Sequence, residues 1–234
     1  MGEGRCHRRT LGRAGAPRNR AVVDFAIETI KLGIYDGRYA PGQRLIEADL
    51  TRDLQVSRGP LREALRRLAA DGLIELVSYR GAVVARPSRD EVAGLFEARE
   101  ALEALAARRA AERIGEGDNR AVARRARSEL STSRDGGGVD SYVRENQQFH
   151  DTILALAGNI HLPRLLAQLE FPAFRASFFR VFDAEERAAS LTEHGIIIGA
   201  IIDGEPKRAE DAMRKHVRRA GRLAQRLPDS LFRS

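Results

Sequence analysis

The sequence predicts a mainly α-helical protein in two parts: a small N-terminal domain that includes a β-hairpin, and a C-terminal domain built only of helices. Its 234 residues, 43% apolar and 31% charged, suit one large or two modest globular domains. Two short runs rich in Val and Ile before residue 88 indicate the hairpin. After residue 89 apolar residues recur only at helical spacing, and glycine-rich breaks separate the segments.

Positive charge is concentrated in the first third of the chain. Residues 1–88 hold 16 Lys and Arg against 10 Asp and Glu, a net charge of +6, whereas residues 89–234 hold 24 against 23, a net charge of +1. Because counterion release supplies most of the sequence-independent affinity for DNA, this favours a polyanionic partner for the N-terminal part. The charge count alone does not distinguish DNA from RNA or from an anionic membrane.

The first residues predict no packed element. Residues 1–18 combine glycines and arginines with few apolar residues, so we expect a disordered basic arm; it could serve non-specific DNA contact or reflect an incorrectly chosen start codon. Cys6, the single cysteine, excludes a disulfide framework and a cysteine-based metal site. No run of 18 apolar residues and no secretory signal occurs, so we expect a cytoplasmic protein that does not enter a membrane.

Two helices joined by a very short turn are predicted next. After a helix that begins at Asn19, Pro41 and Gly42 make a turn, and a short helix covers 47–54. Only two residues separate it from Ser57, whose hydroxyl can cap a helix that runs to Gly72. Such spacing is typical of a helix-turn-helix.

The second of these helices has an apolar stripe and a separate cationic face. The stripe consists of Leu61, Ala64, Leu65 and Leu68. Arg58, Arg62 and Arg66 recur at every fourth residue, which indicates either a solvated face or a surface for nucleic acid.

The hairpin completes a winged helix-turn-helix over residues 19–86. Residues 73–77 and 82–85 form its strands, and residues 78–81 form a tip that carries Arg80. A basic tip of this kind can enter the minor groove beside a recognition helix.

The motifs PG at 41–42, VSRGPLREAL at 56–65 and DGLI at 71–74 closely resemble the GntR family of bacterial transcription regulators. The resemblance covers about residues 20–86 and implies binding to double-stranded operator DNA. It implies DNA contacts at Ser57, Arg58, Gly59, Pro60, Arg62, Arg80 and Gly81.

Within that set, the chemistry of each side chain suggests its role. The guanidinium forks of Arg58 and Arg62 match the O6 and N7 acceptors of guanine, and Ser57 suits a phosphate. We expect Arg66, farther from the helix start, to meet phosphate or solvent. Some family members carry a further contacting arginine where this chain has Ala48, which puts that contact in doubt here.

The C-terminal domain, residues 89–227, is predicted as an all-α bundle of about six helices. Ser88 and Glu91 have the spacing of a capping box at its start. The fourth helix is expected to kink at Pro172. The predicted helices cover roughly 89–115, 118–133, 139–157, 160–182, 185–203 and 205–227.

Three histidines lie on apolar helix faces of this bundle. His150 shares a face with Asn146, and His194 and His216 each lie on an apolar stripe. Three imidazoles and an amide oxygen directed inward suit a divalent metal with an open position. Each histidine could instead be an ordinary hydrogen-bonded core residue.

A second resemblance favours the metal. The motifs RxxLE at 99–103, FH at 149–150, EH at 193–194 and MxxH at 213–216 are similar to the FCD ligand-binding domain, over about residues 90–225. Together the two resemblances indicate the FadR subfamily of GntR regulators. They imply that Asn146, His150, His194 and His216 hold a metal and that Arg99 faces the effector pocket, although a surface role for Arg99 stays open.

Asn146 departs from the aspartate common at its position, so a bound metal would be less compensated in charge. Zinc is our first expectation, with nickel and manganese as alternatives.

The expected function is that of a dimeric, metabolite-responsive transcription regulator. The resemblance implies a cytoplasmic homodimer that acts as a repressor and is released by a small organic acid. One alternative is a metal-dependent enzyme, because three histidines with an open position also describe catalytic zinc. Another is a bundle with a purely structural metal.

Overall fold

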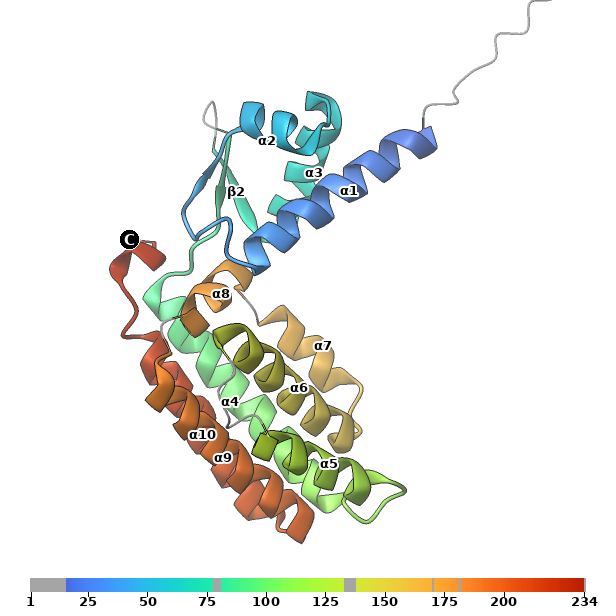
Figure 1. Ribbon diagram of the computed structural model, residues 1–234, viewed down its shortest axis with the longest axis vertical. Helices are drawn as coiled ribbons and strands as arrows, with labels where there is room; N and C mark the ends of the chain where they lie inside the picture. The colour runs from blue at the N-terminus through green and yellow to red at the C-terminus, as the bar shows by residue number, and fades with distance from the viewer. Residues whose placement is uncertain (1–15, 78–80, 133–137, 170, 181, 234) are drawn as a thin grey trace, which may run out of the picture.

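The computed structural model describes residues 16–77, 81–132, 138–169, 171–180 and 182–233, and it has two units (Figure 1). The predicted basic arm lies largely outside the described residues, but residues 16–18 belong to the first helix rather than to the arm. The N-terminal unit consists of α1 (Ala16–Tyr35), β1 (Arg44–Leu45), α2 (Glu47–Leu54), α3 (Arg58–Ala70), β2 (Ile74–Val77) and β3 (Gly81–Val84).

The wing is a three-stranded sheet rather than the two-stranded hairpin that the sequence predicted. β2 and β3 pair antiparallel as expected, and β1 joins the other edge of β3, with Leu45 opposite Ala82. A two-residue strand is too short to show alternation, so only the pairing reveals it. Gly81 begins β3 with φ of 85°, and a side chain there would press on the carbonyl oxygen of Leu45 at 3.1 Å.

The core of the N-terminal unit lies between α1, α3 and the sheet. Leu61, Leu65 and Leu68 of α3 are buried as predicted, against Ile30 and Ile34 of α1. Together with Val84 and other apolar residues of the sheet, they fix the orientation of α3 relative to α1 and the sheet. The short turn before α3 is held by Gln55 in the left-handed region. Ser57 occupies the N-cap position, but its hydroxyl makes no capping hydrogen bond, which leaves that oxygen available.

The C-terminal unit is an all-helical bundle in which the predicted fourth helix is divided into two. The first of these ends at Gln168 and the second begins at Pro172, because proline suits the first turn of a helix better than its interior. The bundle consists of α4 (Arg89–Glu112), α5 (Asn119–Thr132), α6 (Val139–Ala157), α7 (His161–Gln168), α8 (Pro172–Arg180), α9 (Ala184–Asp203) and α10 (Pro206–Ala224).

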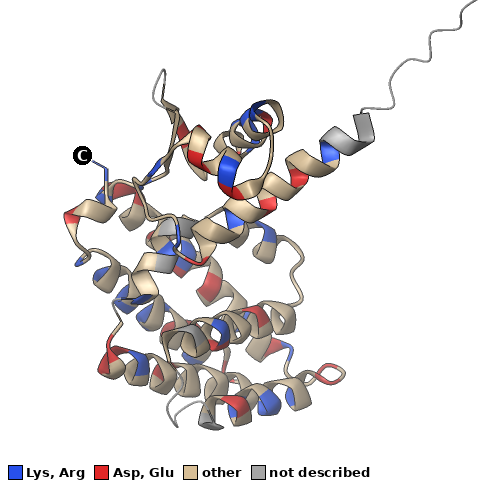
Figure 2. Ribbon diagram, turned by 45° about the horizontal axis from the view of Figure 1, so that its top comes forward, with Lys and Arg blue, Asp and Glu red and all other residues tan. Residues whose placement is uncertain are grey.

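Helix α4 runs through the bundle beside α6 and α10 (Figure 1). Its start carries the predicted capping box, in which the Ser88 hydroxyl accepts from the Glu91 amide and the Glu91 carboxylate accepts from the Ser88 amide. Basic and acidic residues are interspersed over the bundle helices, in keeping with its low net charge (Figure 2). Among the described helices, none is both long and apolar enough to cross a membrane.

The described residues connect the two units through α8, and the C-terminal segment packs against the linker between them. Helix α8 lies against the C-terminal end of α1 (Figure 1), where an Nη2 hydrogen of Arg180 is donated to the carbonyl oxygen of Asp36 at 2.6 Å. The chain after α10 returns through a 3₁₀ turn at Asp229–Leu231, and the amide of Arg233 donates to the carbonyl oxygen of Pro87 at 3.0 Å. Phe232 packs its ring 5.5 Å from that of Phe174 in α8.

Candidate functional site

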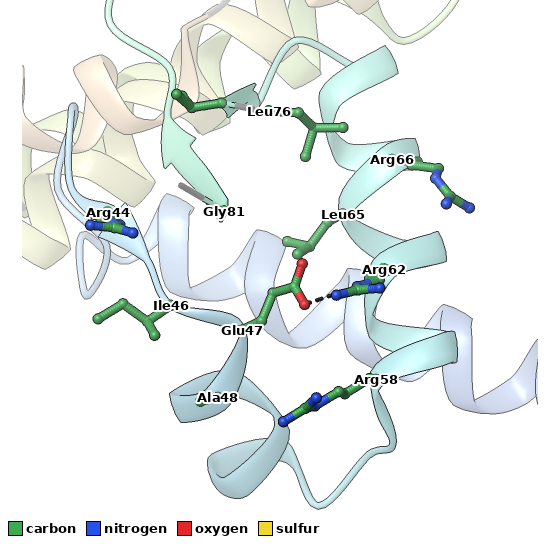
Figure 3. A pocket seen from close by; sticks show the side chains of 11 residues that line it. Arg44, Ile46, Glu47, Ala48, Arg58, Arg62, Leu65, Arg66, Leu76 and Gly81 are labelled. Atoms are coloured by element: carbon green, nitrogen blue, oxygen red, sulfur yellow. Dashed lines mark hydrogen bonds and ion pairs between the residues drawn. The ribbon is translucent and has the colours of Figure 1, made fainter. Parts of the chain in front are cut away.

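An open groove separates the recognition helix α3 from the wing. Figure 3 shows its two walls, α3 on one side and the β1–α2 segment with the sheet on the other. Four arginines contribute to its lining, together with one carboxylate and several apolar residues. The lining residues are Arg44, Ile46, Glu47, Ala48, Arg58, Arg62, Leu65, Arg66, Leu76, Val77 and Gly81.

Of the residues predicted to contact DNA, Arg58, Arg62 and Gly81 line this groove. Ser57, Gly59 and Pro60 form the start and first turn of α3, where free backbone amides suit a phosphate. Arg58 and Arg62 are directed from α3 toward α2, whereas Arg66 is directed away from Glu47 (Figure 3). Arg80 lies outside the described residues.

Two groove residues were not predicted from the sequence. Arg44 of β1 lines the groove opposite α3, and its place depends on the strand pairing that the sequence did not reveal. Glu47 begins α2, and its Oε2 accepts a hydrogen bond from Nε of Arg62 at 2.9 Å. This pair spans 15 residues of sequence, so no helical spacing could have indicated it.

The three histidines of the bundle form one cluster, with ligand atoms within 4.8 Å of one another. His150 comes from α6, His194 from α9 and His216 from α10. The Nε2 atoms of His194 and His216 lie 3.3 Å apart. His194 is fully buried and stacks on the ring of Phe149, with 4.0 Å between the ring centroids. Three adjacent helices thus direct imidazoles to one point.

A carboxylate lies behind each of two histidines. Oε2 of Glu193 is 2.8 Å from Nδ1 of His216, and Oε2 of Glu103 is 2.6 Å from Nδ1 of His150, at an angle outside that of a hydrogen bond. A proton on Nδ1 of His216 leaves the Nε2 lone pair free to bind a metal. Each carboxylate also has an arginine partner: Arg99 for Glu103, at 2.8 Å, and Arg219 for Glu193, also at 2.8 Å.

The electrostatics of the cluster favour charged forms of Glu103 and Glu193 and neutral forms of His194 and His216. Burial favours the neutral form of Glu103, but the charge of Arg99 and the neighbouring His150 hold its pKa well below the usual range. Burial lowers the pKa of His194 well below its usual value, and burial lowers that of His216 as well, although Glu193 opposes this shift. Metal binding requires neutral imidazole, and Nδ1 of His194 is buried without a hydrogen-bond partner. The donor set therefore suits a divalent metal.

A narrow pocket adjoins the cluster. Its cavity is about 30 Å³, and its wall includes Arg99, Asn146, His150 and His216. Asn146 is buried, as predicted, beside His150. Arg99 pairs with the buried Glu103 and also lines the pocket, and its side chain is 28% exposed. The aromatic wall of the pocket comes from Phe96, Tyr142, Phe178, Phe179 and Phe182.

The sequence did not assign the two carboxylates behind the histidines. Glu103 belongs to the RxxLE motif and lies four residues after Arg99, a spacing that predicts their pairing on α4. Neighbouring residues on a helix point about 100° apart, so Glu193 is directed away from its neighbour His194. That geometry holds for His194, but Glu193 reaches His216 across the gap to α10. Such partners depend on helix packing.

Comparisons with known proteins agree with this arrangement. Residues 23–84 match the model of the bacterial regulatory proteins of the gntR family, and residues 94–219 match the FCD domain. The chain is 29% identical to the HTH-type transcriptional repressor GlaR of Escherichia coli, over 80% of this chain and 89% of that protein. It is 27% identical to the HTH-type transcriptional regulator YdhC of Bacillus subtilis, over 80% and 82% of the two chains.

The fold is also similar to that of a solved structure. The structure of E. coli McbR/YncC superposes with a TM-score of 0.66 and 18% identity, over 85% of this chain and 94% of that one. The matched families and relatives are transcription regulators, which rules against the alternative of a metal-dependent enzyme. The protein is a DNA-binding transcription regulator, and the chain belongs to the gntR family of bacterial regulatory proteins, in the group whose C-terminal part is an FCD domain.

Proposed function

We propose that this regulator is a cytoplasmic, homodimeric repressor whose operator affinity is controlled by a small carboxylate bound at a metal in the bundle. The proposed domains are the winged helix-turn-helix at 19–86 and the bundle at 89–227. The observation that carries the proposal is the cluster of three histidines, two of them buried, beside a pocket that Arg99 also lines. The proposal of repression is supported by the similarity to GlaR, which is a transcriptional repressor.

The proposed reading of DNA uses the groove of the N-terminal unit. Arg58 and Arg62 contact guanine edges, and the first turn of α3, with Ser57, Gly59 and Pro60, holds a phosphate. Arg80 and Gly81 of the wing approach the minor groove. One recognition helix reads only a few base pairs, so a two-fold dimer on a pseudo-palindromic operator multiplies the specificity.

The proposed metal is held by His150, His194, His216 and the amide oxygen of Asn146. When bound, the metal offers a Lewis-acidic position that a carboxylate can occupy. Zinc is the first candidate, with nickel and manganese as alternatives. Glu103 and Glu193 supply the negative charge that the neutral side chain of Asn146 does not. They also orient His150 and His216, because each carboxylate lies beside Nδ1 of one imidazole ring. Arg99 provides the second contact of the carboxylate.

Effector control follows from the closed state of the pocket. A cavity of about 30 Å³ is much smaller than the roughly 300–1,000 Å³ of typical small-molecule pockets. An organic acid must therefore displace wall residues such as Phe178 and Phe179 of α8. Because α8 also holds the end of α1 through Arg180, a shift of α8 changes the placement of the recognition helices in the dimer.

The test compares His150→Ala with His161→Ala, an exposed histidine of α7 outside the cluster. Metal content is measured by mass spectrometry, and DNA binding by anisotropy with a palindromic duplex selected from a random pool by the wild-type protein. We expect His150→Ala to lose metal and the response to a panel of small carboxylates, while it keeps its affinity for the duplex. Equal metal content in both variants, or a wild type that ignores every acid, would overturn the proposal.

The coupling has its own test. Arg180→Ala removes the hydrogen bond between α8 and the Asp36 carbonyl without touching the pocket wall. We expect it to bind the responsive acid with little change in affinity and to release DNA less completely. Release equal to that of the wild type would remove α8 from the coupling path.

A further inference from the structure

The groove proposed to face DNA contains one carboxylate, that of Glu47, among its arginines. Glu47 is the acidic member of a lining that otherwise carries Arg44, Arg58, Arg62 and Arg66. An uncompensated negative charge at this position would repel phosphates and weaken binding to any duplex. Its side chain is 29% exposed, so water does not fully screen it.

The contact with Arg62 uses one specific edge of the guanidinium group. Oε2 of Glu47 accepts the Nε hydrogen at 2.9 Å, which leaves both Nη groups without this partner. Two parallel N–H donors are what the O6 and N7 atoms of guanine require. The pair therefore uses the Nε edge of the guanidinium group and leaves its two Nη groups available for a base. It also connects α2 to Arg62 and so fixes the direction in which Arg62 extends (Figure 3).

Arg58 provides an internal comparison. It comes from the same helix and lines the same groove, but it makes no ion pair within the described part of the chain. Of Arg58 and Arg62, the two proposed base readers, only Arg62 has an ion-pair partner among the described residues. A side chain ordered in advance loses less conformational freedom on binding, and it tolerates fewer alternative base contacts.

We propose that Glu47 is a positioning residue for DNA recognition: it fixes Arg62 so that the guanidinium end reads one guanine, and it weakens attraction to unrelated DNA. This inference rests on the proposed reading role of Arg62. Because Glu47 repels phosphate in every duplex but supports a single base contact, its removal is expected to shift specific and non-specific binding in different directions.

The experiment measures two affinities for each variant at several salt concentrations. One duplex is the palindrome selected from a random pool with the wild-type protein, and the other is a scrambled duplex of equal length. The test variant is Glu47→Gln, which keeps the size of the side chain. The matched control is Asp49→Asn, which removes a carboxylate from the same helix where it pairs with Arg52 rather than Arg62.

We expect Glu47→Gln to reduce the ratio of the two affinities about tenfold, the scale of one bidentate base contact, while affinity for the scrambled duplex stays equal or rises. Asp49→Asn should raise both affinities by a similar factor and keep the ratio. If Glu47→Gln behaves like Asp49→Asn, Glu47 is an ordinary surface charge and the inference is wrong. Thermal unfolding of each variant checks that it is folded.

A third variant distinguishes failure of this inference from failure of the proposed function. Arg62→Ala should lower the affinity ratio by itself, and adding Glu47→Gln to it should lower the ratio no further. If Arg62→Ala leaves the ratio unchanged, Arg62 reads no base and both proposals fall. If Arg62→Ala lowers the ratio but Glu47→Gln does not, only the positioning role is rejected.

Discussion

The DNA-facing groove and the histidine cluster handle charge in opposite ways. In the groove, arginines lie at the surface, and the pair between facing walls, Arg62 with Glu47, is half-exposed. In the cluster, Glu103 and His194 are buried, and each of the two carboxylates lies between a histidine and an arginine. Water solvates an exposed cation until it binds a phosphate, whereas a buried charge needs an ion-pair partner inside the fold.

This difference predicts where substitutions act. Changes in the groove should alter DNA binding and leave stability nearly unchanged, because water replaces a lost partner there. Changes in the cluster should alter stability and metal content together.

Removing the buried carboxylate of Glu103 should have the largest effect. Glu103→Ala leaves Arg99 without its ion-pair partner and His150 without the charge behind its ring. We expect the free energy of unfolding to fall by about 3–5 kcal/mol, measured by urea denaturation. Glu112→Ala is the matched control, because Glu112 pairs with Arg108 at the same spacing on α4 but at the surface. Equal effects of the two substitutions would contradict the contrast.

Metal removal should come next. A ligand that binds only the folded state at a hundred times its dissociation constant stabilises the protein by about 2.7 kcal/mol. We therefore expect a chelator to lower the melting temperature of the wild type and to leave that of His150→Ala unchanged. A chelator that shifts both melting curves equally would show that it acts elsewhere on the protein.

Arg58→Ala tests the groove. Loss of a bidentate contact to guanine should reduce discrimination between the selected and scrambled duplexes by about 1–3 kcal/mol, with an unchanged melting temperature. The control is Arg52→Ala in α2, since Arg52 pairs with Asp49 and does not line the groove. An equal loss in the control would mean that total charge, rather than base contact, decides discrimination.

Arg66→Ala should have the smallest effect. Arg66 is directed away from Glu47 and pairs with Glu63 at 3.6 Å (Figure 3). If it meets phosphate, its removal weakens binding to both duplexes alike and reduces the slope of log affinity against log salt by about one. A change in discrimination would instead place Arg66 among the residues that read bases.

The sequence by itself determined the elements whose signals are local. Helical periodicity predicted α3 with its buried leucines, the spacing of Ser88 and Glu91 predicted the capping box, and apolar faces predicted that His194 and His216 point inward. Each of these patterns is complete within a few residues, because a helix repeats every 3.6 residues and its faces follow from that repeat.

Only the tertiary structure decided which partners meet across elements. It added β1 to the sheet, divided the predicted fourth helix before Pro172, and joined Glu47 to Arg62 and Glu193 to His216. These contacts depend on how the helices and strands pack in space, which no local repeat encodes. The sequence therefore indicated which residues face the two sites, and the packing determined which charged groups lie beside them.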